Sequence, residues 1–244
     1  MTRTNNIGFI PIVMTGVMLL VLISLGNWQM DRLAWKNELI ATMAQRDQAE
    51  PLSIKSGADL KVLLRRDHDF HPITIEGTWR VDLEQYWFAT ANNIPDGLAH
   101  RDRVGFHVLT PLALSDGAIL YIDRGFVPER LRDIDARPQN LPQQIEGILR
   151  WPDERTIFDA EDLPSERTWY VRNTIAMAQA SGINSYPFLV EQTAPQMGWP
   201  YAGQSRRVLT NRHLEYALTW YGFGLILVII SALWHIRAYR RVNA

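Results

Sequence analysis

The stretch Leu209–Leu233, LTNRHLEYALTWYGFGLILVIISAL, decides the kind of fold that this chain can adopt. From Ala217 to Leu233 it contains no charged side chain. A helix of about 20 residues, rising about 1.5 Å per residue, covers the hydrocarbon core of a bilayer. With its flanking turn the stretch is long enough for this, and Asn211 or Thr210 can cap its first turn. We therefore predict a transmembrane helix here.

One face of this predicted helix combines an imidazole with aromatic rings and small residues. Positions i, i+3, i+4, i+7 and i+11 share a face, and here they are His213, Tyr216, Ala217, Trp220 and Gly224. The face offers an imidazole, two flat aromatic rings and two small residues, so a planar ligand could lie there. The alternative is an interfacial histidine bonded to a lipid headgroup or to the backbone, and the residues alone leave both open.

A second uncharged stretch, Ile7–Leu25, reads IGFIPIVMTGVMLLVLISL. A cleaved signal peptide has a shorter apolar core and a small-x-small cleavage site. The sequence SLGNWQ, which follows the core, matches such a site poorly. We therefore expect an uncleaved membrane anchor, so that two transmembrane helices bracket the rest of the chain.

These two spans give a domain organisation and an orientation. We expect an N-terminal transmembrane helix at residues 1–28, an extracytoplasmic β-rich domain at 29–212, a C-terminal transmembrane helix at 213–236 and a basic cytoplasmic tail at 237–244. Basic residues flank both spans on both sides, so their count does not fix the orientation. A central segment of about 185 residues can be translocated regardless of its charge. We expect both termini in the cytoplasm.

From Pro72 onward, alternating patterns and β-branched or aromatic runs predict strands. The runs are ITIEGTW, EQYWFAT, GFHVLTPLAL, AILYIDRGFV, QQIEGILRW, TWYVRN and YPFLVEQ. The letters SDG between two of them are a hairpin signal, and the repeated IEG at Ile75 and Ile145 suggests two similar strands in one sheet. Thr174–Ala180 predicts a short helix. The fold class is thus an α+β membrane protein with one mainly antiparallel β domain.

Charged groups in this domain show no catalytic arrangement. There is no nucleophile elbow, HExxH, phosphate loop or GxGxxG, so we do not expect an enzyme. We expect Arg130–Pro142 to form a long exposed loop, and the charges of Asp123-Arg124-Gly125 to pair locally at a strand end. The carboxylates are expected to lie in loops rather than in an apolar frame.

The composition excludes several classes of protein. The formal net charge is −1 and there is no basic stripe, so a nucleic-acid partner is not expected. The chain has no Cys, which excludes disulfides, thiolate metal sites and covalent CxxCH haem attachment. Any haem would therefore be held non-covalently.

Three stretches carry longer patterns. The stretch TNRHLEYALTWYGFGL fits Asn-x-His-Leu-x-Tyr-Ala-x-Thr-Trp-[Phe/Tyr] at Asn211, His213, Leu214, Tyr216, Ala217, Thr219, Trp220 and Tyr221, but Arg212 and Glu215 replace more usual polar residues. LGNWQMDRLAWKNELI fits Gly-x-Trp-Gln-x-x-Arg-x-x-Trp-Lys at Gly26, Trp28, Gln29, Arg32, Trp35 and Lys36. The third stretch, TPLALSDGAILYIDRGFVP, matches a further pattern at Thr110, Pro111, Leu112, Gly117, Arg124, Gly125, Val127 and Pro128. In this order the three resemble the Surfeit locus protein 1 family of cytochrome oxidase biogenesis factors, over nearly the whole chain.

The resemblance implies a membrane-anchored assembly factor for a haem–copper terminal oxidase. Its expected partners are the oxidase's catalytic subunit and membrane lipid, with haem a synthase as a further candidate. The expected location is the bacterial inner (cytoplasmic) membrane, or the mitochondrial inner membrane in a eukaryote. The alternative function is a scaffold that stabilises an oxidase subunit without binding a cofactor.

The resemblance also implies haem a as a transient, non-covalent cofactor. The candidate binding residues are His213 as the axial iron ligand, Tyr216 and Trp220 as aromatic contacts, and Arg32 and Lys36 as cations for a haem propionate. A competing interpretation makes Arg32 and Lys36 part of an aromatic belt with snorkelling cations.

Overall fold

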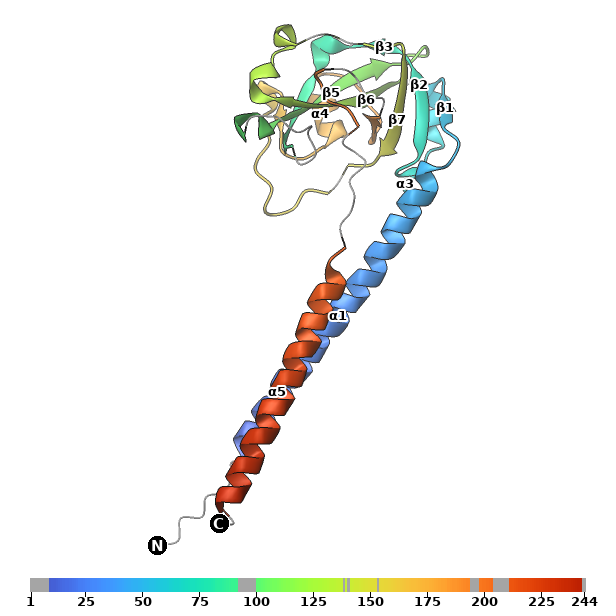
Figure 1. Cartoon of the computed structure of the whole chain (residues 1–244). Helices are drawn as coiled ribbons and strands as arrows, with labels where there is room; N and C mark the ends of the chain where they lie inside the picture. Colours follow the sequence, from blue (N-terminus) through green and yellow to red (C-terminus); the bar gives the residue numbers. More distant parts are fainter. Residues whose placement is uncertain are drawn as a thin grey trace. The chain divides into compact units, whose positions relative to one another are not determined.

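The computed structural model describes residues 9–91, 100–137, 139, 141–152, 154–193, 198–203 and 211–242. The chain divides into two compact units (Figure 1). One is helical and consists of Met1–Thr42 and Val208–Ala244, and the other, Met43–Arg207, contains the sheet.

The helical unit is built from α1 (Phe9–Asp47) and α5 (His213–Val242). Both are long and apolar enough to cross a membrane, with mean hydropathy of 2.4 and 1.9 over their most apolar parts. Few residues of those parts are buried, as expected of helices that face lipid. The prediction of two apolar helices that bracket a β domain is confirmed. The first helix continues beyond the expected end at residue 28, because good helix formers without Pro or Gly follow Gly26.

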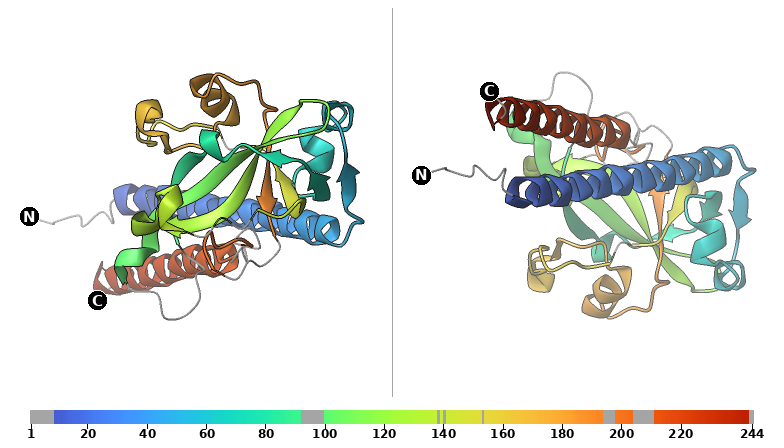
Figure 2. Two further views of the ribbon diagram at one scale, coloured as in Figure 1. Left: turned by 90° about the horizontal axis from the view of Figure 1, so that it is seen from above. Right: turned by 90° about the horizontal axis from the view of Figure 1, so that it is seen from below.

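The two long helices lie side by side and run in opposite directions (Figure 2). Gly26 allows a close approach of the two helices, since a Cβ at this position would lie only 2.7 Å from Cζ of Tyr221. Further along, Thr15 Oγ1 and Ser231 Oγ are 3.3 Å apart and share a hydrogen bond. Small residues and interhelical hydrogen bonds are the usual means of helix association in lipid, where no hydrophobic driving force acts.

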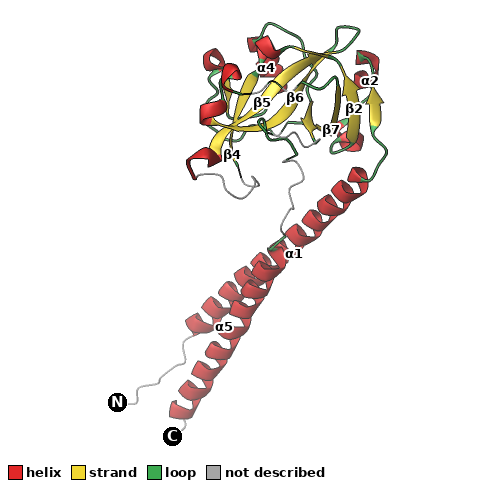
Figure 3. Cartoon of the chain, turned by 45° about the horizontal axis from the view of Figure 1, so that its top comes forward, coloured by secondary structure: helices red, strands yellow, loops and turns green. Residues whose placement is uncertain are grey.

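The second unit contains one mixed sheet (Figure 3). Its strands are β1 (Leu52–Ile54), β2 (Pro72–Glu76), β3 (Thr78–Trp79), β4 (Gln85–Thr90), β5 (Val104–Ala113), β6 (Ile119–Pro128), β7 (Gln144–Arg150), β8 (Thr168–Trp169) and β9 (Leu189–Gln192). The order is β1-β2-β7-β9-β6-β5-β4-β8, and β3 pairs with β5. The pairs β1–β2, β4–β8 and β6–β9 are parallel, and the others are antiparallel.

One local signal correctly predicted strand pairing, and a second correctly placed two strands in one sheet, although it opens only β7 and lies at the end of β2. The segment with SDG joins β5 to β6, which form the longest antiparallel pair, with Gly117 at φ +83° in the turn. The repeated IEG lies on β2 and β7, which are neighbours with Ile75 opposite Ile145.

Short helices surround the sheet: α2 (Gly57–Lys61), α3 (Arg65–His68) and α4 (Thr174–Ala180). Helix α4 has the predicted bounds, and Asn173 Oδ1 caps it by accepting from Ala176 N at 3.0 Å. Its buried Met177 and Ala178 pack with Tyr121 and other core residues of the sheet. Burial of this apolar side stabilises α4, which is too short to be stable alone.

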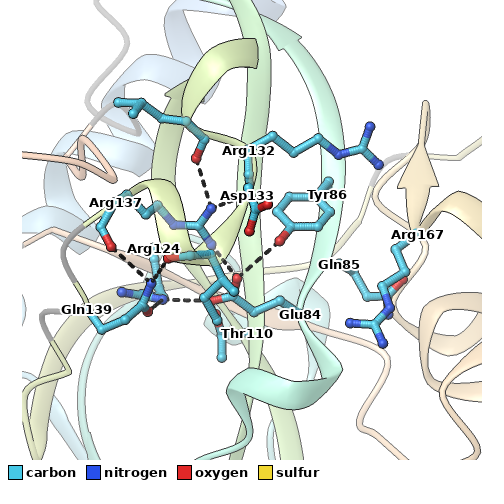
Figure 4. Close-up of polar contacts among 12 residues, drawn as sticks. Glu84, Gln85, Tyr86, Thr110, Arg124, Arg132, Asp133, Arg137, Gln139 and Arg167 are labelled. Atoms are coloured by element: carbon cyan, nitrogen blue, oxygen red, sulfur yellow. Dashed lines mark hydrogen bonds and ion pairs between the residues drawn. The ribbon is translucent and has the colours of Figure 1, made fainter.

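The expectations for the charged groups of this unit were wrong. Arg124 is fully buried within β6, and its Nη1 donates to Glu84 Oε1 at 2.7 Å (Figure 4). Asp123, its neighbour, faces the other way and contacts His107 Nδ1 at 2.9 Å. Adjacent strand residues point to opposite faces, so Asp123 and Arg124 cannot pair with each other. Each therefore finds a distant partner in the apolar frame of the sheet.

The environment of Asp123 determines its protonation. Burial alone would raise the pKa of the Asp123 carboxyl, but the nearby His107 and Arg172 more than offset this. They hold the pKa of Asp123 below its usual value of 3.8. The carboxylate is thus a charged, buried element of the sheet.

The segment Arg130–Pro142 is largely exposed or half-buried in its described residues, as its composition suggested, but it is not a featureless loop. It contains the end of a 3₁₀ turn, Glu129–Leu131, and a second turn, Ile134–Ala136. Arg137 is buried and pairs with Glu84. A buried carboxylate requires charged or hydrogen-bonding partners, and Arg137 is buried as one of the partners of Glu84.

Candidate functional site

The candidate site lies within the helical unit, where the C-terminal and N-terminal sequence patterns meet. His213 is the first residue of α5, and its Nδ1 lies 2.7 Å from Oε1 of Gln29 on α1. The amide oxygen accepts this hydrogen bond, so Nδ1 is the donor, and Nε2 is the ring nitrogen left to bind another group. Metal-binding histidines are typically oriented by such a bond from their other ring nitrogen.

Asn211 fixes the start of α5 against α1. Its Nδ2 donates to Asn37 Oδ1 at 2.8 Å and to the Leu33 carbonyl oxygen at 3.3 Å. Its Oδ1 accepts a longer bond, 3.4 Å, from the backbone N of His213. Asn211 therefore both caps α5 and ties it to α1, while the other predicted cap, Thr210, lies outside the described residues.

A surface depression of ≈ 300 Å³ adjoins this contact. It is lined by Lys36, Arg212, His213 and Tyr216. The structure thus brings together three of the five predicted site residues, His213, Tyr216 and Lys36, and adds Arg212. An imidazole, a phenol and two cationic side chains could receive an aromatic ligand that bears carboxylates.

Arg32 and Trp220 do not line this depression. The guanidinium carbon of Arg32 lies 5.8 Å from the ring centre of Trp28 and 5.5 Å from that of Trp35. These are cation–π contacts, the arrangement expected of an aromatic belt. Trp220 packs edge-on against Phe223, with ring centres 6.1 Å apart. Their proposed contacts with a cofactor remain predictions.

Gln29 and Asn37 are site residues that the sequence patterns did not single out. Gln29 belongs to the N-terminal pattern, but nothing there connects it with a histidine 184 positions away. One signal was available: Gln29 is an amide among apolar and aromatic residues at the end of a predicted span. Such a group requires a hydrogen-bond partner, and the nearest candidates are on the other helix.

His235 lies in a different place on the same helix. Its Nδ1 contacts the Ser231 carbonyl oxygen at 2.7 Å, one turn earlier. Its buried Nε2 has no hydrogen-bond partner among the described residues. His235 lines another depression with Thr15 and Ser231, so it is separate from the His213 site and offers an internal control for it.

The sequence matches the model of the SURF1 family over residues 16–225, which includes both helices' contributions to the site. Surfeit locus protein 1 of Mus musculus is 32% identical over 232 residues, which cover 89% of this chain and 72% of the relative. The Homo sapiens protein of the same name is 31% identical over 82% of this chain and 69% of its own length. A SURF1-like protein of Monosiga brevicollis is 31% identical, over 88% of this chain and 82% of its own length.

Proposed function

This chain belongs to the SURF1 family, and we propose that it is a membrane-anchored assembly factor for a haem–copper terminal oxidase that binds haem a non-covalently. In this proposal the helical unit holds the cofactor and delivers it to the oxidase's catalytic subunit, with haem a synthase as a candidate donor. The observation that carries the proposal is the hydrogen bond between His213 Nδ1 and Gln29 Oε1, because it leaves Nε2 available as a ligand.

The residues around the depression fit such a cofactor. When bound, haem would supply an iron that accepts a nitrogen ligand and propionates that carry negative charge. His213 presents its imidazole in an orientation fixed by Gln29, and Lys36 lines the same depression as a cation for a propionate. The apolar surfaces of the two helices suit a macrocycle that partitions into lipid. Since the chain has no Cys, no thioether bond would prevent release.

A scaffold function is the second candidate, and a specific observation favours it. The bonds from Gln29 to His213 and from Asn211 to Asn37 also join the two helices directly. In this alternative, His213 serves helix pairing, and the protein stabilises an oxidase subunit intermediate. Neither function requires catalysis, and the names of the relatives describe no enzymatic activity.

Haem titration of the purified full-length chain separates the two functions. His213→Ala should abolish or strongly weaken binding and remove the Soret band, whereas the matched variant His235→Ala should bind normally. The thermal midpoint of both variants should be measured, because loss of the helix pair would also weaken binding. A folded His213→Ala variant with a full haem complement and an unchanged Soret band would refute His213 as the ligand and favour the scaffold.

We further propose that both termini face the cytoplasm. Two spans that bracket the sheet unit put both termini on one side of the membrane, and a central segment of about 185 residues can be translocated regardless of its charge. Topology reporters fused after Arg130 and after Ala244 should then show opposite sidedness. Identical sidedness would exclude this orientation.

A further inference from the structure

A loop in the sheet unit presents two large apolar side chains to solvent. We define the Ile157 loop as residues 154–162. Ile157 is 93% exposed and Phe158 is 90% exposed, more than any other large apolar side chain in the described part of the chain. Transfer of each side chain out of water would be favourable, and exposed apolar patches on folded proteins commonly mark interaction sites.

Hydrogen bonds within the loop fix the conformation of this tip. Asp159 Oδ2 accepts from the backbone N of Thr156 at 2.6 Å and from its Oγ1 at 2.9 Å. The guanidinium of Arg155 donates to the Ala160 carbonyl oxygen at 2.8 Å and pairs with Asp162. The loop therefore holds Ile157 and Phe158 outward in a defined turn. An element that is ordered before binding loses less conformational entropy when it docks.

The loop is also anchored to the rest of its unit. Asp162 Oδ1 accepts a hydrogen bond from the backbone N of Tyr170 at 2.7 Å, just after β8. Arg155 is thus connected through Asp162 to the sheet. This anchoring makes the exposed tip a projection of the folded domain.

The charge of the loop indicates the kind of partner. Between Glu154 and Asp162 there are four carboxylates and one basic residue, Arg155, which gives a net charge of −3. Membrane surfaces with anionic lipids attract basic segments and repel acidic ones. An apolar tip bordered by acids instead complements a protein pocket with an apolar floor and a basic rim.

We propose that the Ile157 loop is a docking surface for a protein partner. Ile157 and Phe158 enter an apolar pocket of that partner, and the exposed Glu154 and Glu161 face basic side chains at its rim. The inference rests on the proposed function for the identity of the partner, which is the catalytic subunit of the oxidase. That subunit, purified, is the probe in the experiment.

The test compares two double variants of the full-length chain in lipid nanodiscs. Ile157→Ser with Phe158→Ser should weaken binding of the catalytic subunit by about tenfold or more, since buried apolar anchors dominate interfaces. The matched control is Val62→Ser with Leu64→Ser, which removes exposed apolar side chains elsewhere in the same unit and should leave the affinity unchanged. Unchanged affinity of the Ile157/Phe158 variant, or equal loss in the control, would overturn the proposal.

Two further measurements test the charge and exclude the membrane. Glu154→Lys with Glu161→Lys should slow association and reduce its salt dependence. Because the chain has no native Cys, Ile157→Cys can carry a single environment-sensitive fluorophore. Its emission should shift to the blue only when the catalytic subunit is added. A blue shift in nanodiscs of phosphatidylethanolamine and phosphatidylglycerol alone would show lipid contact and overturn the proposal.

The outcome can be separated from that of the haem-binding proposal. Haem titration reports on the helical unit, and the loop variants should keep the wild-type Soret band. Loop variants that bind both haem and the subunit normally would refute the docking surface and leave haem binding intact. A His213→Ala variant that loses haem but keeps loop-dependent docking would support the docking surface.

Discussion

Replacing Glu84 by glutamine should strongly destabilise the sheet unit, because two buried cations depend on this carboxylate. Glu84 is 1% exposed, and Arg124 is fully buried. Oε1 accepts from Arg124 Nη1 at 2.7 Å and from Thr110 Oγ1 at 3.0 Å, while Oε2 pairs with Arg137 (Figure 4). Burial lowers the pKa of the Arg124 guanidinium from its ordinary value, and the Glu84 carboxylate opposes that effect.

The size of this loss of stability follows from the burial of Glu84, Arg124 and Arg137. Glutamine keeps the shape of the side chain and one acceptor oxygen, so the substitution mainly removes the negative charge. It leaves Arg124 and Arg137 as like charges in a region of low dielectric constant. Removing one partner of a buried ion pair costs about 3–5 kcal/mol. At about 2–4 °C per kcal/mol for a unit of this size, the melting temperature should fall by about 6–20 °C.

Thermal unfolding of the full-length chain in detergent, followed by tryptophan fluorescence, measures the effect. Asp82→Asn is the matched control, because the Arg80–Asp82 pair is exposed and its loss should cost about 1 kcal/mol or less. Adding Arg137→Gln to Glu84→Gln should cost less than the sum of the single variants, as expected for coupled residues. If Glu84→Gln is as mild as Asp82→Asn, the buried network does not hold this unit together.

Three further predictions concern the helix pair and the pH dependence of stability. Gly26→Ala should destabilise the helix pair by about 1–3 kcal/mol, because the added methyl overpacks the helix contact, and it should lower the resistance of the protein to unfolding by dodecyl sulfate. Gly16→Ala, whose Cβ meets nothing within 4 Å, should have neither effect. Equal effects of the two substitutions would exclude the helix contact as the cause. Gln29→Leu should weaken haem binding by about 10–100-fold, whereas Asn27→Leu should bind haem normally. Equal affinities of the two variants in a haem titration would contradict the role of Gln29 in orienting the His213 imidazole. Asp123 has a depressed pKa in the folded state, so its stabilisation is fully present above about pH 4 and lost as the pH falls through that pKa. In denaturant titrations at decreasing pH, the free energy of unfolding of Asp123→Asn should therefore fall less steeply than that of the wild type. Parallel curves for the two proteins would refute this role of Asp123.

The sequence by itself determined the features that depend on neighbouring residues. The uncharged runs of Ile7–Leu25 and Ala217–Leu233 predicted the two apolar helices, since span length and polarity are local properties. Alternation predicted most strands, and the turn letters SDG joined β5 to β6. The spacing from His213 to Tyr216 predicted two residues that line one depression, because helical periodicity alone puts them on one face.

Only the tertiary structure decided which distant groups meet. β9 lies between β7 and β6, although nothing local to its four residues specifies either neighbour. The sequence led us to expect local pairing of Asp123 and Arg124, whereas in the sheet they face opposite sides and Arg124 meets Glu84. The contact between Gln29 and His213 likewise joins positions 184 residues apart. A residue's own segment fixes its backbone conformation and its face, whereas its partner depends on how separate segments pack to satisfy buried polar groups.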